Sequence, residues 1–295
     1  MVGGTGFTGS RTSSILFDRG FEVLALSGHP DRPHPLKEVR VGRLCFDDPA
    51  ALKRAIDGAQ VLYNTYWIRF ERGSTTFEQA VANTLTLFKA AKEAGVKKIV
   101  HISITNPSEM SKYPYFRGKA VVEGELAGLG VPYTILRPAL VFGKGDVLIN
   151  NIAWVLRSYH MFPIFGEFRV CPIFVDDLAR AAVERADTQE NEIVDCIGPE
   201  CFTFRELVRT VAVNTGARAL LFRTSPKTAY RLSGMLSWII GEPVVTPDEI
   251  GALVDNLLYV EAKPIGRMSL ADWVAKERDS LGRDFASEIQ RHYTK

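Results

Sequence analysis

The chain has 295 residues, of which 46% are hydrophobic and 24% charged, and its formal net charge is +2. These values are ordinary for a globular enzyme with a large buried core, and they exclude a collagen-like or disordered chain. The charge balance, which lacks a basic run, predicts no nucleic-acid partner. The longest apolar stretch falls short of the roughly 20 residues that a transmembrane segment needs. The four cysteines are scattered, so we expect free thiols in a reducing, cytoplasmic setting and no metal site.

The first feature along the chain is a glycine array. Gly3, Gly6 and Gly9 have the spacing G-x-x-G-x-x-G, and a helical pattern follows directly. In such a loop, backbone N–H groups approach a pyrophosphate unhindered, and the next helix presents its positive end to the same anion. The array therefore predicts a dinucleotide-binding loop, formed together with Phe7 and Thr8.

Strand-length apolar runs alternate with helical patterns through the first two-thirds of the chain. We expect strands at 22–27, 39–44, 60–65, 97–103 and 132–137, and helices at 10–19, 49–57, 75–94 and 114–129. Four glycines stand between a helix and the next strand, where a left-handed C-terminal cap is easiest: Gly20, Gly58, Gly95 and Gly130. The alternation predicts an α/β fold with a doubly wound parallel sheet of the Rossmann type. Only Met1 and Val2 precede the glycine array, so we expect its first strand to be truncated.

The regular alternation ends after Arg137. We expect a helix at 176–186, a last strand at 192–197, and mainly helices from 202 onward: 204–215, 227–240, 246–258 and a final segment to 293. This predicts two domains. A nucleotide-binding domain comprises 1–139 and 173–198, and a smaller, mostly helical substrate-binding lobe comprises 140–172 and 199–295.

The apolar helix at 230–240 has several interpretations. Leu232, Met235 and Trp238 lie within it, together with further large apolar side chains. We interpret them as packing against the main lobe. A lid, a membrane-surface contact and a dimer face are the alternatives.

Tyr115 and Lys119 form the sequence Y-x-x-x-K, which places both side chains on one face of a helix. An ammonium group beside a phenol stabilises the phenolate and lowers the tyrosine pKa from about 10. Such a tyrosine exchanges the proton that accompanies hydride transfer at a hydroxyl or carbonyl carbon. Tyr259 and Lys263 repeat the spacing, but only Tyr115 lies just beyond a predicted sheet strand, where such sheets bind ligands. We therefore interpret the second pair as structural.

With these motifs the chain resembles an extended or atypical short-chain dehydrogenase/reductase. The resemblance rests on the glycine array, Asn83, the Tyr115/Lys119 pair, and the segments 136–143 (LRPALVFG) and 174–179 (FVDDLA). It is strongest for the subgroup that includes the accessory subunit of respiratory complex I, NmrA-like proteins, and bacterial relatives labelled nucleotide-sugar epimerases. The ending 284–293 is also similar to that subgroup.

The resemblance implies roles for further residues. Tyr115, Lys119 and a hydroxyl after the fifth strand would be catalytic; the slot for that hydroxyl holds Ile104, so Ser103 or Thr105 would have to replace it, and we take Ser103 as the candidate. Lys119 would also hold the nicotinamide ribose. The remaining cofactor contacts implied by the resemblance are Asn64, Thr65, Tyr66, Pro138, Ala139 and Val141.

The segment after the strand at 22–27 indicates the choice of cofactor. A carboxylate there would bind the ribose 2′-hydroxyl of NAD, whereas basic and polar groups accommodate the 2′-phosphate of NADP. The tip of this strand carries no carboxylate; Ser27, His29, Arg32 and the nearby Arg11 suit a phosphate. We expect NADP, with NAD as the alternative because Asp31 lies close by.

Taken together, the motifs predict an NAD(P)-dependent oxidoreductase or epimerase that acts on a hydroxyl or carbonyl carbon of a small-molecule substrate. The alternative is a non-catalytic NAD(P)H-binding sensor or assembly factor, which the substitution at Ile104 favours. The sequence leaves a homo-oligomer open.

Overall fold

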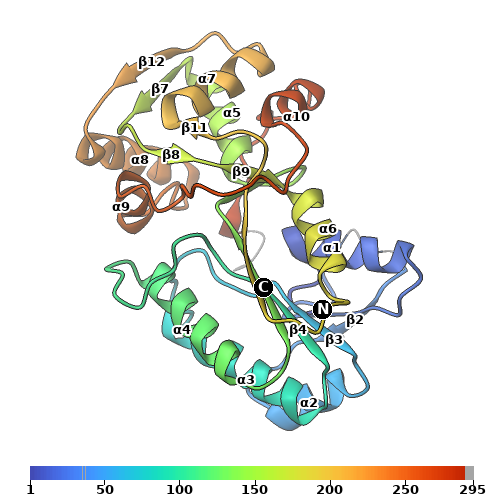
Figure 1. Ribbon diagram of the computed structural model, residues 1–295. Helices are drawn as coiled ribbons and strands as arrows, with labels where there is room; N and C mark the ends of the chain where they lie inside the picture. The colour runs from blue at the N-terminus through green and yellow to red at the C-terminus, as the bar shows by residue number, and fades with distance from the viewer. Residues whose placement is uncertain (35, 37, 290–295) are drawn as a thin grey trace. The chain divides into compact units, whose positions relative to one another are not determined.

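The computed structural model describes residues 1–34, 36 and 38–289, so the last part of the family-like ending, 290–293, lies outside the described residues. The chain divides into two compact units (Figure 1). The first consists of Met1–Pro138 and Val175–Cys196, and the second of Ala139–Phe174 and Ile197–Lys295. The assignment of the second unit to substrate binding remains a prediction.

The first unit is built on a parallel sheet. Its strands are β1 (Leu24–Ser27), β2 (Arg40–Arg43), β3 (Val61–Asn64), β4 (Lys98–Ile102), β5 (Tyr133–Pro138) and β10 (Glu192–Cys196). Four of them run in the order β10-β5-β4-β3, β1 pairs with β2, and Val2 bridges β1 and β3 in parallel. The resulting order, with Val2 at its centre, is that of a Rossmann-type sheet, which confirms the predicted fold class.

Residues Met1 to Gly3 occupy the central strand position, although only Val2 forms ladder bridges. The Val2 N–H donates to the Tyr63 carbonyl (2.8 Å) and the Gly3 N–H to the Leu26 carbonyl (3.0 Å). Val2 is fully buried, and the Met1 ammonium donates to the Leu24 carbonyl. Burial lowers the pKa of that ammonium to about 5. The first strand is therefore as short as expected, yet it still joins the two halves of the sheet.

Helices cover both faces of this sheet. They are α1 (Phe7–Asp18), α2 (Pro49–Ile56), α3 (Phe77–Glu93), α4 (Pro114–Gly128) and α6 (Val175–Glu184). Helices α1 and α6 pack together on one face, and α2, α3 and α4 form a row on the other (Figure 1). The four predicted cap glycines all have left-handed backbone: Gly20, Gly58, Gly95 and Gly130. The core between these layers is aliphatic, with Leu62, Leu87, Ile99, Leu126 and Ile135 almost fully buried.

The second unit is more mixed than expected. Its helices are α5 (Leu148–Tyr159), α7 (Phe204–Thr215), α8 (Pro226–Ile240), α9 (Pro247–Val254) and α10 (Leu270–Lys276). Three strand pairs accompany them: β6 (Leu140–Phe142) with β9 (Pro172–Phe174), β7 (Met161–Ile164) with β12 (Leu220–Arg223), and β8 (Arg169–Val170) with β11 (Phe202–Thr203). Phenylalanines and Trp273 fill much of its core. Strands of two to four residues carry too little alternation to be predicted from the sequence.

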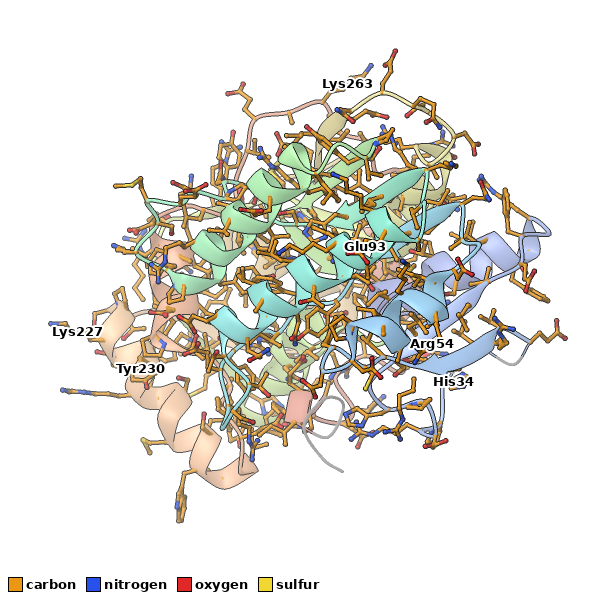
Figure 2. All side chains as sticks on the ribbon, turned by 90° about the horizontal axis from the view of Figure 1, so that it is seen from below. His34, Arg54, Glu93, Lys227, Tyr230 and Lys263 are labelled. Carbon is orange, nitrogen blue, oxygen red and sulfur yellow. A yellow bond between two sulfur atoms is a disulfide. The ribbon has the colours of Figure 1, made fainter. Side chains whose placement is uncertain are left out.

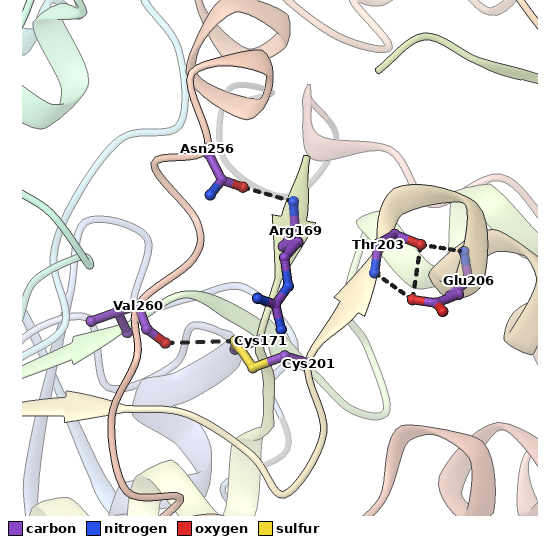
Figure 3. Close-up of a disulfide and its surroundings, with 7 residues drawn as sticks. All are labelled: Arg169, Cys171, Cys201, Thr203, Glu206, Asn256 and Val260. Carbon is purple, nitrogen blue, oxygen red and sulfur yellow. Dashed lines mark hydrogen bonds between the residues drawn. A yellow bond between two sulfur atoms is a disulfide. The ribbon is translucent and has the colours of Figure 1, made fainter. Parts of the chain in front are cut away.

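The expectation of free thiols was wrong for two of the four cysteines. Cys171 and Cys201 form a disulfide (Figure 3). Cys45 and Cys196 are free. The antiparallel register explains the pairing, because Val170 lies opposite Phe202 and the next residues, Cys171 and Cys201, therefore meet. The two cysteines are 30 residues apart in the sequence, and each lies next to a different short strand, so no spacing motif predicted their pairing.

Candidate functional site

The backbone conformation of the glycine loop leaves no room for side chains at Gly3 and Gly9. Gly3 has a φ of +72°, and a Cβ atom on Gly9 would lie 2.1 Å from the Gly3 carbonyl oxygen. The Gly6 N–H donates to that same carbonyl (2.9 Å), and the Thr65 hydroxyl donates to the carbonyls of Val2 (3.0 Å) and Gly3 (3.3 Å). Thr65, which the resemblance assigned to cofactor contact, thus also fixes the loop from the end of β3.

Helix α1 begins without a side-chain cap. Its N-cap residue is Gly6, whereas α2 and α3 are capped by the side chains of Asp48 and Thr76. The amides of Phe7 and Thr8 in the first turn are therefore not covered by a capping side chain, and they carry the positive end of the helix dipole. A Cβ on Gly6 would meet only the Gly3 oxygen, at 3.2 Å. This loop fits the pyrophosphate of a dinucleotide. The first-turn amides of α1 can donate hydrogen bonds to it, and the glycines place no side chains in its way.

Two alanine substitutions separate the structural role of the loop from its binding role. We expect Gly9→Ala to destabilise the chain by about 3 kcal/mol or more, because its methyl group would overlap the Gly3 carbonyl. The backbone at Gly6 is extended, a conformation that alanine tolerates. Gly6→Ala is therefore expected to lower the free energy of unfolding by under about 1 kcal/mol but to weaken NADPH binding about tenfold or more. Thermal unfolding and NADPH titration of both variants measure these effects. Unchanged NADPH affinity in Gly6→Ala would contradict the assignment.

The proposed 2′-phosphate residues begin next to this loop. The Thr5 hydroxyl donates to the Ser27 hydroxyl (3.0 Å), which also accepts the His29 N–H (3.1 Å). The Arg32 N–H donates to the His29 carbonyl, forming a turn directly after β1. Arg11 lies on α1 with its Nε 3.4 Å from an Asp176 carboxylate oxygen. The structure thus brings Ser27 to the glycine loop and pairs Arg11 with Asp176; their contact with a phosphate remains a prediction.

Asn64 joins β3 to β4 in the centre of the sheet. Its side chain is fully buried; Nδ2 lies 3.1 Å from Nδ1 of His101, and Oδ1 accepts the Tyr66 N–H. The Asn83 amide, on α3, donates to the Tyr66 hydroxyl (3.0 Å). Burial lowers the pKa of His101 well below its usual value, so this imidazole is neutral in the folded chain. Asn64 and Tyr66 are therefore held rigidly where β3 ends.

Lys119 is buried on α4 and reaches the end of β4. Its ammonium donates to the Ile102 carbonyl (2.8 Å) and lies 4.4 Å from the centre of the Trp67 ring. Burial lowers the pKa of Lys119 from 10.5 to about 7, while the carboxylate of Glu123 opposes that shift. Glu123 itself pairs with Arg137 from β5. This ion pair joins α4 to β5.

Tyr115 lies in the first turn of α4, one turn before Lys119, within an aromatic cluster. Its ring packs edge-on against Trp67 and Phe77, at centroid distances of 6.0 and 5.9 Å. Gly118 lets the indole approach α4, since a Cβ there would lie 3.2 Å from the Trp67 ring. Trp67 also has a buried Nε1 with no hydrogen-bond partner within the described ranges. The contacts of Trp67 with both Tyr115 and Lys119 could not be predicted from the sequence.

The segment after β4 supplies the third catalytic candidate. The Ser103 N–H donates to the Leu136 carbonyl (2.7 Å), and its hydroxyl is buried without a hydrogen-bond partner among the residues described. Ile104 is buried beside it, and the Thr105 N–H donates to the Pro138 carbonyl. A buried hydroxyl normally has a partner, so Ser103 is available to a ligand oxygen in a way that Ile104 is not.

The remaining candidates lie in the second unit. Val141 belongs to β6, and Ala139 precedes it. Tyr259 and Lys263 lie in a segment without helical structure, so their spacing does not place them on one face. The Tyr259 ring instead packs under the Arg169 guanidinium, 4.0 Å from its centroid.

Comparison with known proteins supports the interpretation of the first unit. Residues 3–146 match a family model described as NAD(P)H-binding. The chain is 28% identical over 222 residues to a mitochondrial protein of Arabidopsis thaliana named NADH dehydrogenase [ubiquinone] 1 alpha subcomplex subunit 9. That match covers 70% of this chain and 55% of the relative, so the chain spans only about half of that protein.

Solved structures show the same fold. The triphenylmethane reductase of Citrobacter sp., complexed with NADP(H), has a TM-score of 0.76 at 19% identity and covers 94% of this chain and 98% of its own. An NADPH-dependent quinone oxidoreductase of Escherichia coli, complexed with NADPH, has a TM-score of 0.73 at 18% identity and covers 93% and 98%. Among the described residues, no helix has the length and apolarity of a membrane span.

Proposed function

We propose that this chain, whose residues 3–146 match a family model described as NAD(P)H-binding, is an NADP(H)-dependent oxidoreductase of the short-chain dehydrogenase/reductase type. It would act on a hydroxyl or carbonyl carbon of a small molecule. The observation that carries the proposal is the buried Lys119 ammonium, which lies one turn from Tyr115 and at the end of β4 next to Ser103. A buried ammonium whose pKa is lowered this far by desolvation is typical of a functional site.

Each residue of this group has a role that follows from its chemistry. The first-turn amides of α1 would hold the pyrophosphate, and the bound nicotinamide supplies a hydride. Tyr115 would donate its phenolic proton to the substrate oxygen, and Ser103 would hold that oxygen with its unpartnered hydroxyl. Lys119 would stabilise the resulting phenolate; a pKa of about 7 also lets it exchange a proton at neutral pH.

The surroundings of Tyr115 favour an apolar, aromatic substrate over a nucleotide sugar. Trp67 and Phe77 pack edge-on around the Tyr115 ring, and aromatic faces of this kind bind planar apolar groups. The two structural relatives described above are named for a triphenylmethane and a quinone, which are less polar ring compounds than sugars. A quinone or an aromatic carbonyl compound is therefore our first choice, with epimerisation of a sugar as the alternative reaction.

A screen of NADPH oxidation tests this function. The panel contains quinones, aromatic aldehydes and ketones, and nucleotide sugars, each followed by loss of nicotinamide absorbance or by product analysis. We expect turnover with at least one aromatic acceptor and a preference for NADPH over NADH. Turnover only with nucleotide sugars would contradict the proposed reduction and favour epimerisation as the reaction.

A non-catalytic role is the second candidate. It is favoured by Ile104 in the usual hydroxyl slot and by the relative named as a subunit of NADH dehydrogenase. In that case NADPH would bind tightly, and the whole panel would give no turnover. The same relative is named mitochondrial, so the cytoplasmic location expected from the sequence remains a prediction.

A further inference from the structure

The outward face of α8 is apolar. Its exposed large side chains are Tyr230, Leu232, Met235, Trp238 and Ile239. Trp238 is 86% exposed, Met235 66% and Ile239 65%, whereas Ala229 is the buried residue on this helix. A surface helix normally turns its large apolar residues toward the core. On α8 they are exposed instead.

Cations share this exposed side of α8. Lys227, Arg231, Met235 and Trp238 follow one another at intervals of four, four and three residues, which is one side of a helix. Ile239 lies beside this stripe. Lys227 and Tyr230 are labelled on α8 in Figure 2. The cations thus stand at the N-terminal half of the exposed side, and the most exposed apolar groups at the C-terminal half.

The surrounding sequence carries a net positive charge because it lacks acidic residues. Residues 207–241 contain no aspartate or glutamate, but five basic residues: Arg209, Arg218, Arg223, Lys227 and Arg231. This stretch is far more positive than the whole chain, whose net charge is +2.

Among the residues that the structure describes, neither Lys227 nor Arg231 of α8 forms an ion pair with an acidic side chain. Arg223 pairs with Glu167, outside the helix. From the adjacent α9, Glu249 binds the N-cap of its own helix, and Asp248 lies exposed in the same turn.

We propose that α8 docks this chain on an anionic phospholipid surface. Trp238, Met235 and Ile239 would enter the interface, and Lys227 and Arg231 would contact lipid phosphates. A basic helix with an apolar face and a tryptophan is the pattern that binds in the plane of a membrane. At 15 residues α8 is suited to lie on a bilayer and is too short to cross one.

Vesicle co-sedimentation of the full chain tests the proposal. One set of vesicles is pure phosphatidylcholine, and the other is phosphatidylcholine mixed with phosphatidylglycerol. We expect binding to the anionic vesicles that weakens as salt is raised. We also expect a blue shift of tryptophan emission on binding, which disappears in Trp238→Phe because that indole is the most exposed of the four.

Paired variants separate the two contributions. Met235→Ser with Trp238→Ser is expected to lower vesicle binding about tenfold or more. Lys227→Gln with Arg231→Gln is expected to lower it about 25-fold, since each cation near an anionic surface contributes about fivefold. Met110→Ser, at a side chain 92% exposed in the first unit, is the apolar control. Lys89→Gln with Lys97→Gln removes two exposed charges elsewhere and is the charge control.

Three results would overturn the proposal. The first is equal affinity of the wild-type chain for both kinds of vesicle, or for neither. The second is a loss of binding in the controls as large as that in the α8 variants. The third is a concentration-dependent dimer in solution that Trp238→Ser abolishes, which would identify a second copy as the partner. Unchanged thermal unfolding and NADPH binding in each variant show that folding is intact.

Discussion

Replacing Tyr115 by phenylalanine is expected to lower kcat about 100- to 10,000-fold, the range that a positioned general acid contributes. The ring remains, so its packing against Trp67 and Phe77 is retained and the fold is preserved. Because the hydroxyl serves the reaction and not the glycine loop, NADPH affinity should change little. Steady-state kinetics on the best substrate of the panel, with an NADPH titration beside them, measure both quantities.

The second Y-x-x-x-K sequence offers a matched control. Tyr259→Phe removes a phenol with the same sequence spacing to a lysine, but from a segment without helical structure. It should leave kcat and NADPH affinity near the wild-type values. If Tyr115→Phe turned over as fast as Tyr259→Phe, the acid/base role would be wrong.

Replacing Lys119 by methionine is expected to stabilise the folded chain near neutral pH while impairing catalysis. The pKa of Lys119 is about 7 in the folded chain against 10.5 without the protein environment. Below pH 7 both states carry the proton, and the folded state bears the full cost of the buried charge. Between pH 7 and 10.5 the unfolded chain binds more protons, so the wild-type stability rises with pH. We expect Lys119→Met to be more stable by a few kcal/mol at pH 6, and this advantage to shrink toward pH 10.

Denaturant unfolding across this pH range measures the difference. Lys97→Met, at an exposed lysine, serves as the control and should show no such trend. In Lys119→Met the loss of the ammonium should also lower kcat, because the Tyr115 phenolate would lose its stabilising charge. A pH-independent stability difference between wild type and Lys119→Met would contradict the lowered pKa.

The sheet could be predicted because its signals are local. Each strand–helix unit ends at a glycine with left-handed backbone, and the apolar runs are long enough to show their period. The spacing of Tyr115 and Lys119 needed only one helix to place them together. The strands β6 to β9 escaped prediction because each has two to four residues and pairs with a distant segment.

The contacts that shape the site depend on packing between residues far apart in the sequence, so no local sequence pattern predicts them. Trp67 lies against Lys119 only because the segment after β3 reaches α4 in the folded unit and Gly118 leaves room. Thr65 binds the glycine loop across a gap of more than 60 residues. The exposure of the apolar face of α8 could not be predicted either. The periodicity of the sequence shows which residues share one side of the helix, but not whether that side faces the core.

The most direct test of the account is a titration of this chain with NADPH and with NADH, following the quenching of its four tryptophans and the energy transfer to the nicotinamide. We predict saturable binding with tighter affinity for NADPH, and about tenfold or weaker binding in Gly6→Ala. Failure of the folded chain to bind either nucleotide would contradict the central claim that the glycine loop and α1 form a dinucleotide site.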